Sequence, residues 1–300
     1  MAKIVLRLAA GLIALYFTTL AAGAQDWITV KSSAFAAPSE GQKAKNGLPD
    51  GYEVRAVTGD IARAWYTKPT KRYRHAILGD AVEAGGLRVV LRNGEPVNLT
   101  LAKNLVFEDR TPRLIDLDGD GRNELITLLS SSTKGAAIAV YGMRDGKLQQ
   151  VSRTPFVGRT NRWRNIAGIA DYNGDGRVDI AEVITPHIGG TLKFWTWRDG
   201  RLLSTASAKF FSNHAIGSPE QRLSATADFD GDGRADIAVP GGNRRNLYLI
   251  GFTNSNKLKQ LAEISLESEI TRPILLQQTS SGAVLKLGLA DGSYWIVQRK

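Results

Sequence analysis

The sequence predicts an all-β fold, a β-propeller of about five four-stranded blades. A short acidic segment occurs three times, as "DLDGDGRNEL" at 116–125, "DYNGDGRVDI" at 171–180 and "DFDGDGRADI" at 228–237. Its first Asp falls at 116, 171 and 228, a step of 55 and then 57 residues. Short β-like runs separated by Gly turns follow each copy. Units of four short strands repeated at roughly 50 residues are typical of propellers, whose blades pack face to face around an axis.

The same succession follows every acidic segment and predicts the strands of one unit. A hydrophobic run comes first ("ELITLL", "DIAEVI", "DIAVP"), then a turn containing Gly135, Gly190 or Gly242, then an alternating or aromatic run. A second turn reads "RDGKL" at 144–148, "RDGRL" at 198–202 and "NSNKL" at 254–258. Asp-Gly between two β-like runs indicates a hairpin. Each unit is therefore expected to be an antiparallel meander with strands a to d and the acidic segment between a and b.

Two further units lack the acidic segment. Residues 83–99 contain a turn at Gly86 and an Asn-Gly hairpin at 93–94, and residues 280–297 turn at Asp291-Gly292. The last unit stops after its strand c, whereas "IARAWYT" at 61–67 has no partner in its own unit. We therefore expect 61–67 to pair with 293–298 and complete the last blade, which leaves no free strand edge there.

The N-terminus resembles a targeting segment. Lys3 and Arg7 precede an apolar stretch that ends in Ala22-Gly23-Ala24, as in a secretory signal peptide cleaved after Ala24. A retained membrane anchor is the alternative, because the stretch is near the lower length limit for spanning a bilayer. No Cys follows, which excludes a lipoprotein anchor. The expected organisation is a signal peptide at 1–24, an N-terminal arm or linker at 25–51 and the propeller at 52–300, in a periplasmic or secreted protein.

Charge and cysteine content constrain how this chain is stabilised. It has no Cys and a formal charge of +10. An exported protein of this size without disulfides is stabilised by a large core or by bound metal. Eleven of the 29 acidic residues lie in the three acidic segments, so the rest of the surface is strongly basic. Such a surface attracts polyanions. The alternative is that scattered Lys and Arg merely keep the protein soluble.

The acidic segments are suited to a calcium ion. Positions one, three, five and nine carry side-chain oxygens, and the carbonyl of position seven can add another. About six hard oxygen ligands on a tight loop suit Ca²⁺, whereas Mg²⁺ prefers a smaller octahedral shell and softer metals prefer His or Cys. Glycines at positions four and six permit a sharp turn with positive φ. Solvated Asp-Gly turns are the alternative, but they explain three copies at one spacing poorly.

An EF-hand is the other alternative for these loops. Residues 171–182 satisfy the EF-hand motif, with Glu182 at its twelfth position. The other two copies have Thr127 and Val239 there, and the flanking segments are too short or too β-like for helices. We therefore interpret Glu182 as an ordinary strand residue.

The acidic segment resembles the calcium loop of FG-GAP (VCBS) repeats, found in integrin-type β-propellers and in many secreted bacterial proteins. The resemblance implies three Ca²⁺ sites. Their ligands are Asp116, Asp118, Asp120, Arg122 (carbonyl) and Glu124; Asp171, Asn173, Asp175, Arg177 (carbonyl) and Asp179; Asp228, Asp230, Asp232, Arg234 (carbonyl) and Asp236. Glu124 replaces the usual closing Asp and Asn173 removes a charge, so the affinities should differ. Family propellers often have seven blades, whereas this chain has residues for about five.

Catalytic residues are not apparent. His75, His187 and His214 form no metal-binding pair in the sequence, and there is no Gly-x-Ser-x-Gly elbow or phosphate-binding glycine loop. Stretches that combine Arg and aromatic residues at 72–75, 162–164 and 194–197 either bind sugars and phosphates or pack the blades. We expect a monomeric, non-catalytic binding or scaffold module of the bacterial envelope, for an anionic glycan or a protein and not for nucleic acid. The alternative is an envelope hydrolase or lyase acting at the propeller channel.

Overall fold

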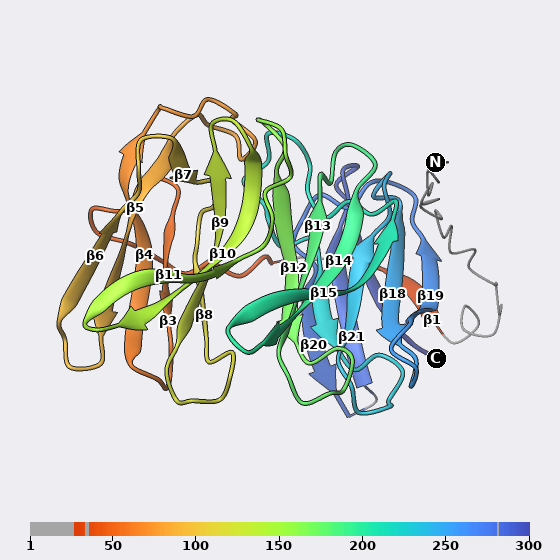
Figure 1. The fold of residues 1–300 in the computed structure, drawn as a ribbon. Coiled ribbons are helices and arrows are strands. Elements are labelled where there is room, and N and C mark those ends of the chain that lie inside the picture. The colour runs from red at the N-terminus through yellow and green to blue at the C-terminus, as the bar shows by residue number, and fades with distance from the viewer. Residues whose placement is uncertain (1–26, 34–35, 281) are drawn as a thin grey trace, which may run out of the picture.

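The computed structural model describes residues 27–33, 36–280 and 282–300 (Figure 1). Every regular element in these ranges is a β-strand, and all strand pairs are antiparallel, which confirms the all-β class. Among the described residues no helix has the length and apolar character needed to cross a membrane. The predicted signal peptide at 1–24 lies outside the described residues.

The third and fourth units each form the predicted four-stranded meander, with neighbouring strands in chain order. The third sheet consists of β12 (Arg164–Ala170), β13 (Asp179–Ile184), β14 (Thr191–Arg198) and β15 (Arg201–Lys209). The fourth consists of β16 (Ala225–Ala227), β17 (Asp236–Pro240), β18 (Asn246–Phe252) and β19 (Leu258–Ser265). The Asp-Gly hairpin of the third unit joins β14 to β15, where Arg198 faces Arg201.

The first two units share one sheet of ten strands. Its strands are β2 (Gln42–Lys43), β3 (Tyr52–Arg55), β4 (Ile61–Thr70), β5 (Glu83–Leu91), β6 (Pro96–Thr100), β7 (Leu105–Phe107), β8 (Arg113–Ile115), β9 (Glu124–Ser131), β10 (Gly135–Arg144) and β11 (Lys147–Arg153). The short strand β7 joins the two units because it pairs with both β5 and β9. The Asn93-Gly94 hairpin links β5 and β6 as predicted. Gly86, predicted to lie in a turn, is instead inside β5, opposite Thr67 and Thr100.

The last sheet is completed by an N-terminal strand, but not by the predicted one. It contains β20 (Leu275–Thr279), β21 (Gly282–Gly288), β22 (Tyr294–Arg299) and β1 (Trp27–Ser32). β1 runs antiparallel to β22, from Trp27 opposite Arg299 to Ser32 opposite Tyr294. The predicted pairing of 61–67 with 293–298 is wrong, because 61–67 lies in β4, which pairs locally with β3 and β5. The segment 25–51, predicted as an arm, contributes β1 and β2 to the sheets.

Consecutive sheets pack face to face through apolar side chains. Ile138 and Ile180 belong to one buried cluster between the second and third units. Phe194 contacts Phe252 between the third and fourth, with ring centroids 5.0 Å apart. Leu249 of β18 and Leu285 of β21 belong to a further cluster between the fourth unit and the last sheet. Removing these faces from water is the main force that holds the sheets together.

Alternation of strand direction gives the sheets two distinct ends. We call the end that carries the β8–β9, β12–β13 and β16–β17 loops the lower end, as drawn in Figure 1. The β9–β10, β13–β14 and β17–β18 turns and the connections between units lie at the upper end, which the β4–β5 connection crosses in the same view. All three acidic segments therefore lie at the lower end.

Candidate metal centre

The three acidic segments fold into loops with the same internal hydrogen bonds. In each, the first Asp accepts hydrogen bonds from the amides three and five residues later; for Asp116 these are Gly119 and Gly121, at 2.8 and 2.9 Å. Asp171 and Asp228 repeat both bonds. The glycines are Gly119, Gly121, Gly174, Gly176, Gly231 and Gly233, all with φ between 72° and 85°. Side chains rarely adopt this conformation, which explains why both positions are glycine in every copy.

The ninth-position acid of each loop is buried where the second strand begins. Glu124, Asp179 and Asp236 are at most 2% exposed. Each accepts a hydrogen bond from the amide of the loop's second residue, at 3.1 Å, 3.1 Å and 2.8 Å. Burial raises the pKa of Glu124 and of Asp236 to about 7, and it raises the pKa of Asp179 as well. A cation in the loop would offset the cost of burying these carboxylates in their charged form.

The carboxylates converge most closely in the first and third loops. Oxygens of Asp116, Asp118 and Asp120 lie within 4.8 Å of one another, as do those of Asp228, Asp230 and Asp236. In the part of the chain that the structure describes, these are the two groups of acidic or His side chains close enough together to hold one metal ion. In the second loop an amide replaces the third-position carboxylate, and Asn173 Oδ1 accepts a hydrogen bond from the amide of Asp175 at 2.9 Å. All three loops offer oxygen donors only, the chemistry that Ca²⁺ prefers.

Basic side chains approach the same oxygens from outside. The side chains of the seventh-position arginines, whose carbonyls are the predicted ligands, lie next to the fifth-position acids. Arg177 lies 3.6 Å from Asp175, Arg122 lies 4.0 Å from Asp120, and Arg234 pairs with Asp232. Ion pairs this exposed contribute little to stability. They are weak competitors for a divalent ion at the loop.

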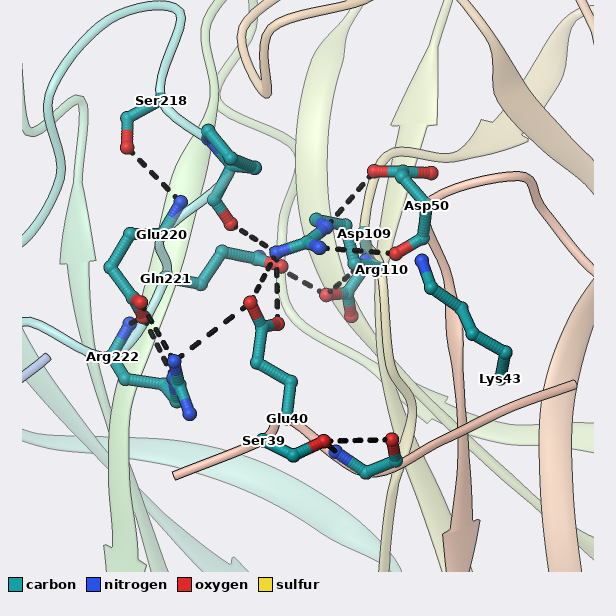
Figure 2. Close-up of polar contacts among 12 residues, drawn as sticks. Ser39, Glu40, Lys43, Asp50, Asp109, Arg110, Ser218, Glu220, Gln221 and Arg222 are labelled. Atoms are coloured by element: carbon teal, nitrogen blue, oxygen red, sulfur yellow. Dashed lines mark hydrogen bonds and ion pairs between the residues drawn. The ribbon is translucent and has the colours of Figure 1, made fainter. Parts of the chain in front are cut away.

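A polar network that sequence reasoning did not find lies between the two ends, where Arg110 falls in the break between the pairing of β7 with β9 and that of β8 with β9 (Figure 2). The guanidinium of Arg110, 6% exposed, donates hydrogen bonds to Glu40 at 2.8 and 2.9 Å, to Asp50 at 2.9 Å and to the carbonyl of Pro219 at 2.5 Å. Arg222 approaches the same Glu40 carboxylate at 3.8 Å. These residues come from three distant parts of the chain, 40–50, 110 and 219–222, so no local pattern marks them.

Two histidines meet at the upper end, where His187 lies in the β13–β14 turn. His187 Nε2 lies 3.0 Å from His214 Nδ1, and both rings pack against Trp163. Burial lowers the pKa of His187 to about 4 and that of His214 to about 3, so both are neutral near pH 7. Their separation in the sequence gave no sign of a pair. His75 instead contacts the buried carboxylate of Glu108 at 2.5 Å.

The aromatic stretches are buried in the sheets. Tyr73, Trp163, Phe194 and Trp197 are at most 6% exposed, which favours the packing interpretation over sugar binding. Glu182 lies in β13 as predicted, and its carboxylate forms a buried ion pair with Arg164 at 2.8 Å. No helix flanks the second loop in the described ranges, so the EF-hand alternative is excluded.

Comparison with protein-family models matches the FG-GAP-like repeat to residues 116–182 and to residues 171–239. Each match begins at the first Asp of an acidic loop, and the two overlap at the second loop. A search of curated proteins finds no match to this chain.

Proposed function

Since this chain is an FG-GAP repeat protein over residues 116–239, we propose that it is a calcium-stabilised β-propeller. It acts as a non-catalytic binding or scaffold module in the bacterial envelope, periplasmic or secreted, for an anionic glycan or a protein partner. The three loops hold Ca²⁺ through the fifteen residues named above as ligands.

The observation that supports calcium most strongly is the buried ninth-position acid of every loop. A carboxylate buried without a strong partner is costly in its charged form. Glu124 has Arg144 at 3.9 Å, while Asp179 and Asp236 have no ion pair in the described part of the chain. A divalent ion bound by the remaining loop oxygens supplies the missing charge. Ca²⁺ fits better than Mg²⁺ because the loop offers many oxygens in irregular geometry.

The arrangement of the sheets supports the propeller. The units pack face to face in chain order, and an N-terminal strand completes the last one, as expected of blades around an axis. Five blades result when the ten-stranded sheet is divided at β7 into its first and second units. A basic surface outside the loops supports an anionic partner.

Calorimetric titration of the calcium-free protein with CaCl₂ tests this function. We expect three binding sites in the wild type and two in Asp228→Asn, which removes the acid that organises the third loop. Asp199→Asn is the matched control, because Asp199 is a fully exposed hairpin residue whose side chain is 93% exposed, and it should keep three sites. Absence of calcium heat, or equal heat from MgCl₂, would contradict the proposal.

A further inference from the structure

Eight basic residues gather on the upper end of the first three units. They come from four segments and are Lys68, Lys71, Arg72, Arg74, Lys103, Lys134, Arg159 and Arg162; all but Arg162 are exposed. We call them the basic surface. Backbone hydrogen bonds place the segments side by side, from Ser132 to the carbonyl of Asn104 at 3.0 Å and from Gly158 to the carbonyl of Lys134 at 2.8 Å. The amide of Asn161 donates to the Tyr73 hydroxyl at 3.1 Å.

The bases of the basic surface are not neutralised by ion pairs, and the one exposed acid of the β4–β5 connection, Asp80, pairs with none of them. None of its eight side chains forms an ion pair with an acid in the described part of the chain, whereas Arg122, Arg177, Arg234 and Lys259 at the lower end all do. Burial, with Glu108 nearby, raises the pKa of neighbouring Glu83 to about 9, so Glu83 adds no negative charge at neutral pH. A concentration of unpaired positive charge indicates an anionic partner.

Large apolar side chains are exposed on the same end. Of the seven exposed in the described residues, three lie here: Ile188 (60%), Phe210 (73%) and Ile216 (71%). Phe210 and Ile216 border a pocket of about 450 Å³ whose wall includes His187 and Arg244. Phe210 has a φ of 73°, a left-handed conformation that is rare for a bulky residue. Its backbone is held there by the amide of Gly242, which donates to the Phe210 carbonyl at 2.7 Å.

These apolar residues adjoin the basic surface. The amide of Gly217, next to Ile216, donates to the carbonyl of Ile77 at 2.9 Å, which fixes this segment against the connection that carries Arg74. Trp163, next to Arg162, stacks on His187, next to Ile188. One continuous end therefore presents both unpaired bases and protruding aliphatic and aromatic groups.

Unpaired bases beside exposed apolar side chains favour a lipid surface over a polysaccharide as the partner. Anionic headgroups attract clustered Lys and Arg, and exposed aromatic and aliphatic side chains insert at the boundary of the acyl chains. A sugar polymer would instead need several exposed aromatic faces for stacking, but Tyr73 and Trp163 are buried, and Phe210 is the one aromatic among the exposed large apolar side chains of the described residues. Building on the binding-module function proposed above, we propose that the upper end binds an anionic lipid bilayer, with Phe210, Ile216 and Ile188 inserted between the headgroups.

Vesicle co-sedimentation tests the charged part of this surface. The exported protein, saturated with calcium, is mixed with vesicles of equal parts phosphatidylcholine and phosphatidylglycerol, or of phosphatidylcholine alone. We expect binding to the anionic vesicles only, weakening as salt rises. The variant Lys71→Glu/Arg74→Glu/Lys134→Glu should bind at least about 100-fold more weakly, since each base near the surface contributes about fivefold.

The matched control reverses three exposed bases in the lower-end hairpins, Lys147→Glu/Arg201→Glu/Lys257→Glu. This control has the same net charge and the same N-terminus, so any contribution of residues 1–24 to binding cancels. It should retain most of the binding. An equal loss in both triple variants would overturn the proposal, because net charge and not the upper end would then determine binding.

A second pair of variants tests the apolar part. Phe210→Asn/Ile216→Asn should weaken vesicle binding about tenfold, and Asn tolerates the positive φ at position 210. The control Val57→Asn changes a fully exposed apolar residue at the lower end and should bind like the wild type. The lipid proposal fails, and the partner is a glycan, if two results are found together. These are normal vesicle binding by the apolar variant, and loss of binding to an acidic polysaccharide resin by the upper-end triple variant. If the wild type does not bind vesicles but its calcium titration still shows three sites, the lipid proposal fails and the function proposed above stands.

Discussion

The acidic loops and the Arg110 network are held together in opposite ways. In each loop the first Asp is bonded locally, since in the described part of the chain every hydrogen bond to Asp116, Asp171 or Asp228 comes from an amide within five residues. The Arg110 side chain is instead held by distant residues, Glu40, Asp50 and the carbonyl of Pro219, which lies 109 residues away. We propose that calcium balances the clustered carboxylates of the loops, whereas Glu40 and Asp50 already balance the charge of Arg110. Stability should then depend on calcium at the loops and be independent of it at the Arg110 network.

Calcium removal should have the largest effect. Each site adds about 2.7 kcal/mol to the free energy of unfolding at a hundredfold excess of calcium over its Kd, so a chelator should lower the melting temperature markedly. Asp232→Ala should lower it in calcium and shift it little in chelator. Asp80→Ala and Asp291→Ala lie outside the loops, so each should change the melting temperature by the same amount in calcium and in chelator. An unchanged wild-type melting temperature in chelator would refute the metal sites.

Arg110→Met should have the next largest effect, equal in calcium and in chelator. Removing one partner of a buried ion pair costs about 3–5 kcal/mol, because Glu40 and Asp50 would lose their common partner. Chemical denaturation of the wild type and of the variant, each in calcium and in chelator, measures this loss of stability. The control Arg198→Met breaks an exposed pair with Asp199 and should cost less than about 1 kcal/mol. If the Arg110 cost disappears in chelator, the loops and the Arg110 network are coupled and the comparison above is wrong.

The histidine pair should have the smallest effect at neutral pH, where both rings are neutral, and should instead produce a pH dependence in the acid range. Burial lowers the pKa of His187 to about 4 and that of His214 to about 3, below the ordinary 6.5. Between pH 6.5 and 4 the unfolded chain therefore binds more protons, so the free energy of unfolding should fall as the pH falls, by up to about 1.4 kcal/mol per pH unit for each proton. His187→Gln/His214→Gln should reduce this slope in saturating calcium. An identical slope in the double variant would contradict it.

The acidic loops were predictable because their geometry is contained in a few consecutive residues. Two glycines at fixed positions allow positive φ, and the first Asp can reach only the amides that follow it. The Asn93-Gly94 hairpin was predictable for the same reason. The predicted ligands of each loop are likewise close in the chain, and the structure brings oxygens of Asp116, Asp118 and Asp120, and of Asp228, Asp230 and Asp236, within 4.8 Å of one another.

Pairings between distant segments were decided by the tertiary structure. The sequence indicated that an N-terminal strand completes the last sheet, but both 61–67 and 27–32 have strand character. β4 takes its partners from β3 and β5, which are close in the chain and need little loop closure. That leaves β1 for the edge of β22, where Trp27 also packs on Phe229 with ring centroids 6.0 Å apart. The Arg110 network and the His187–His214 pair arise in the same way, because only the packing of whole sheets brings such residues together, and no local pattern records which distant neighbours a side chain will meet.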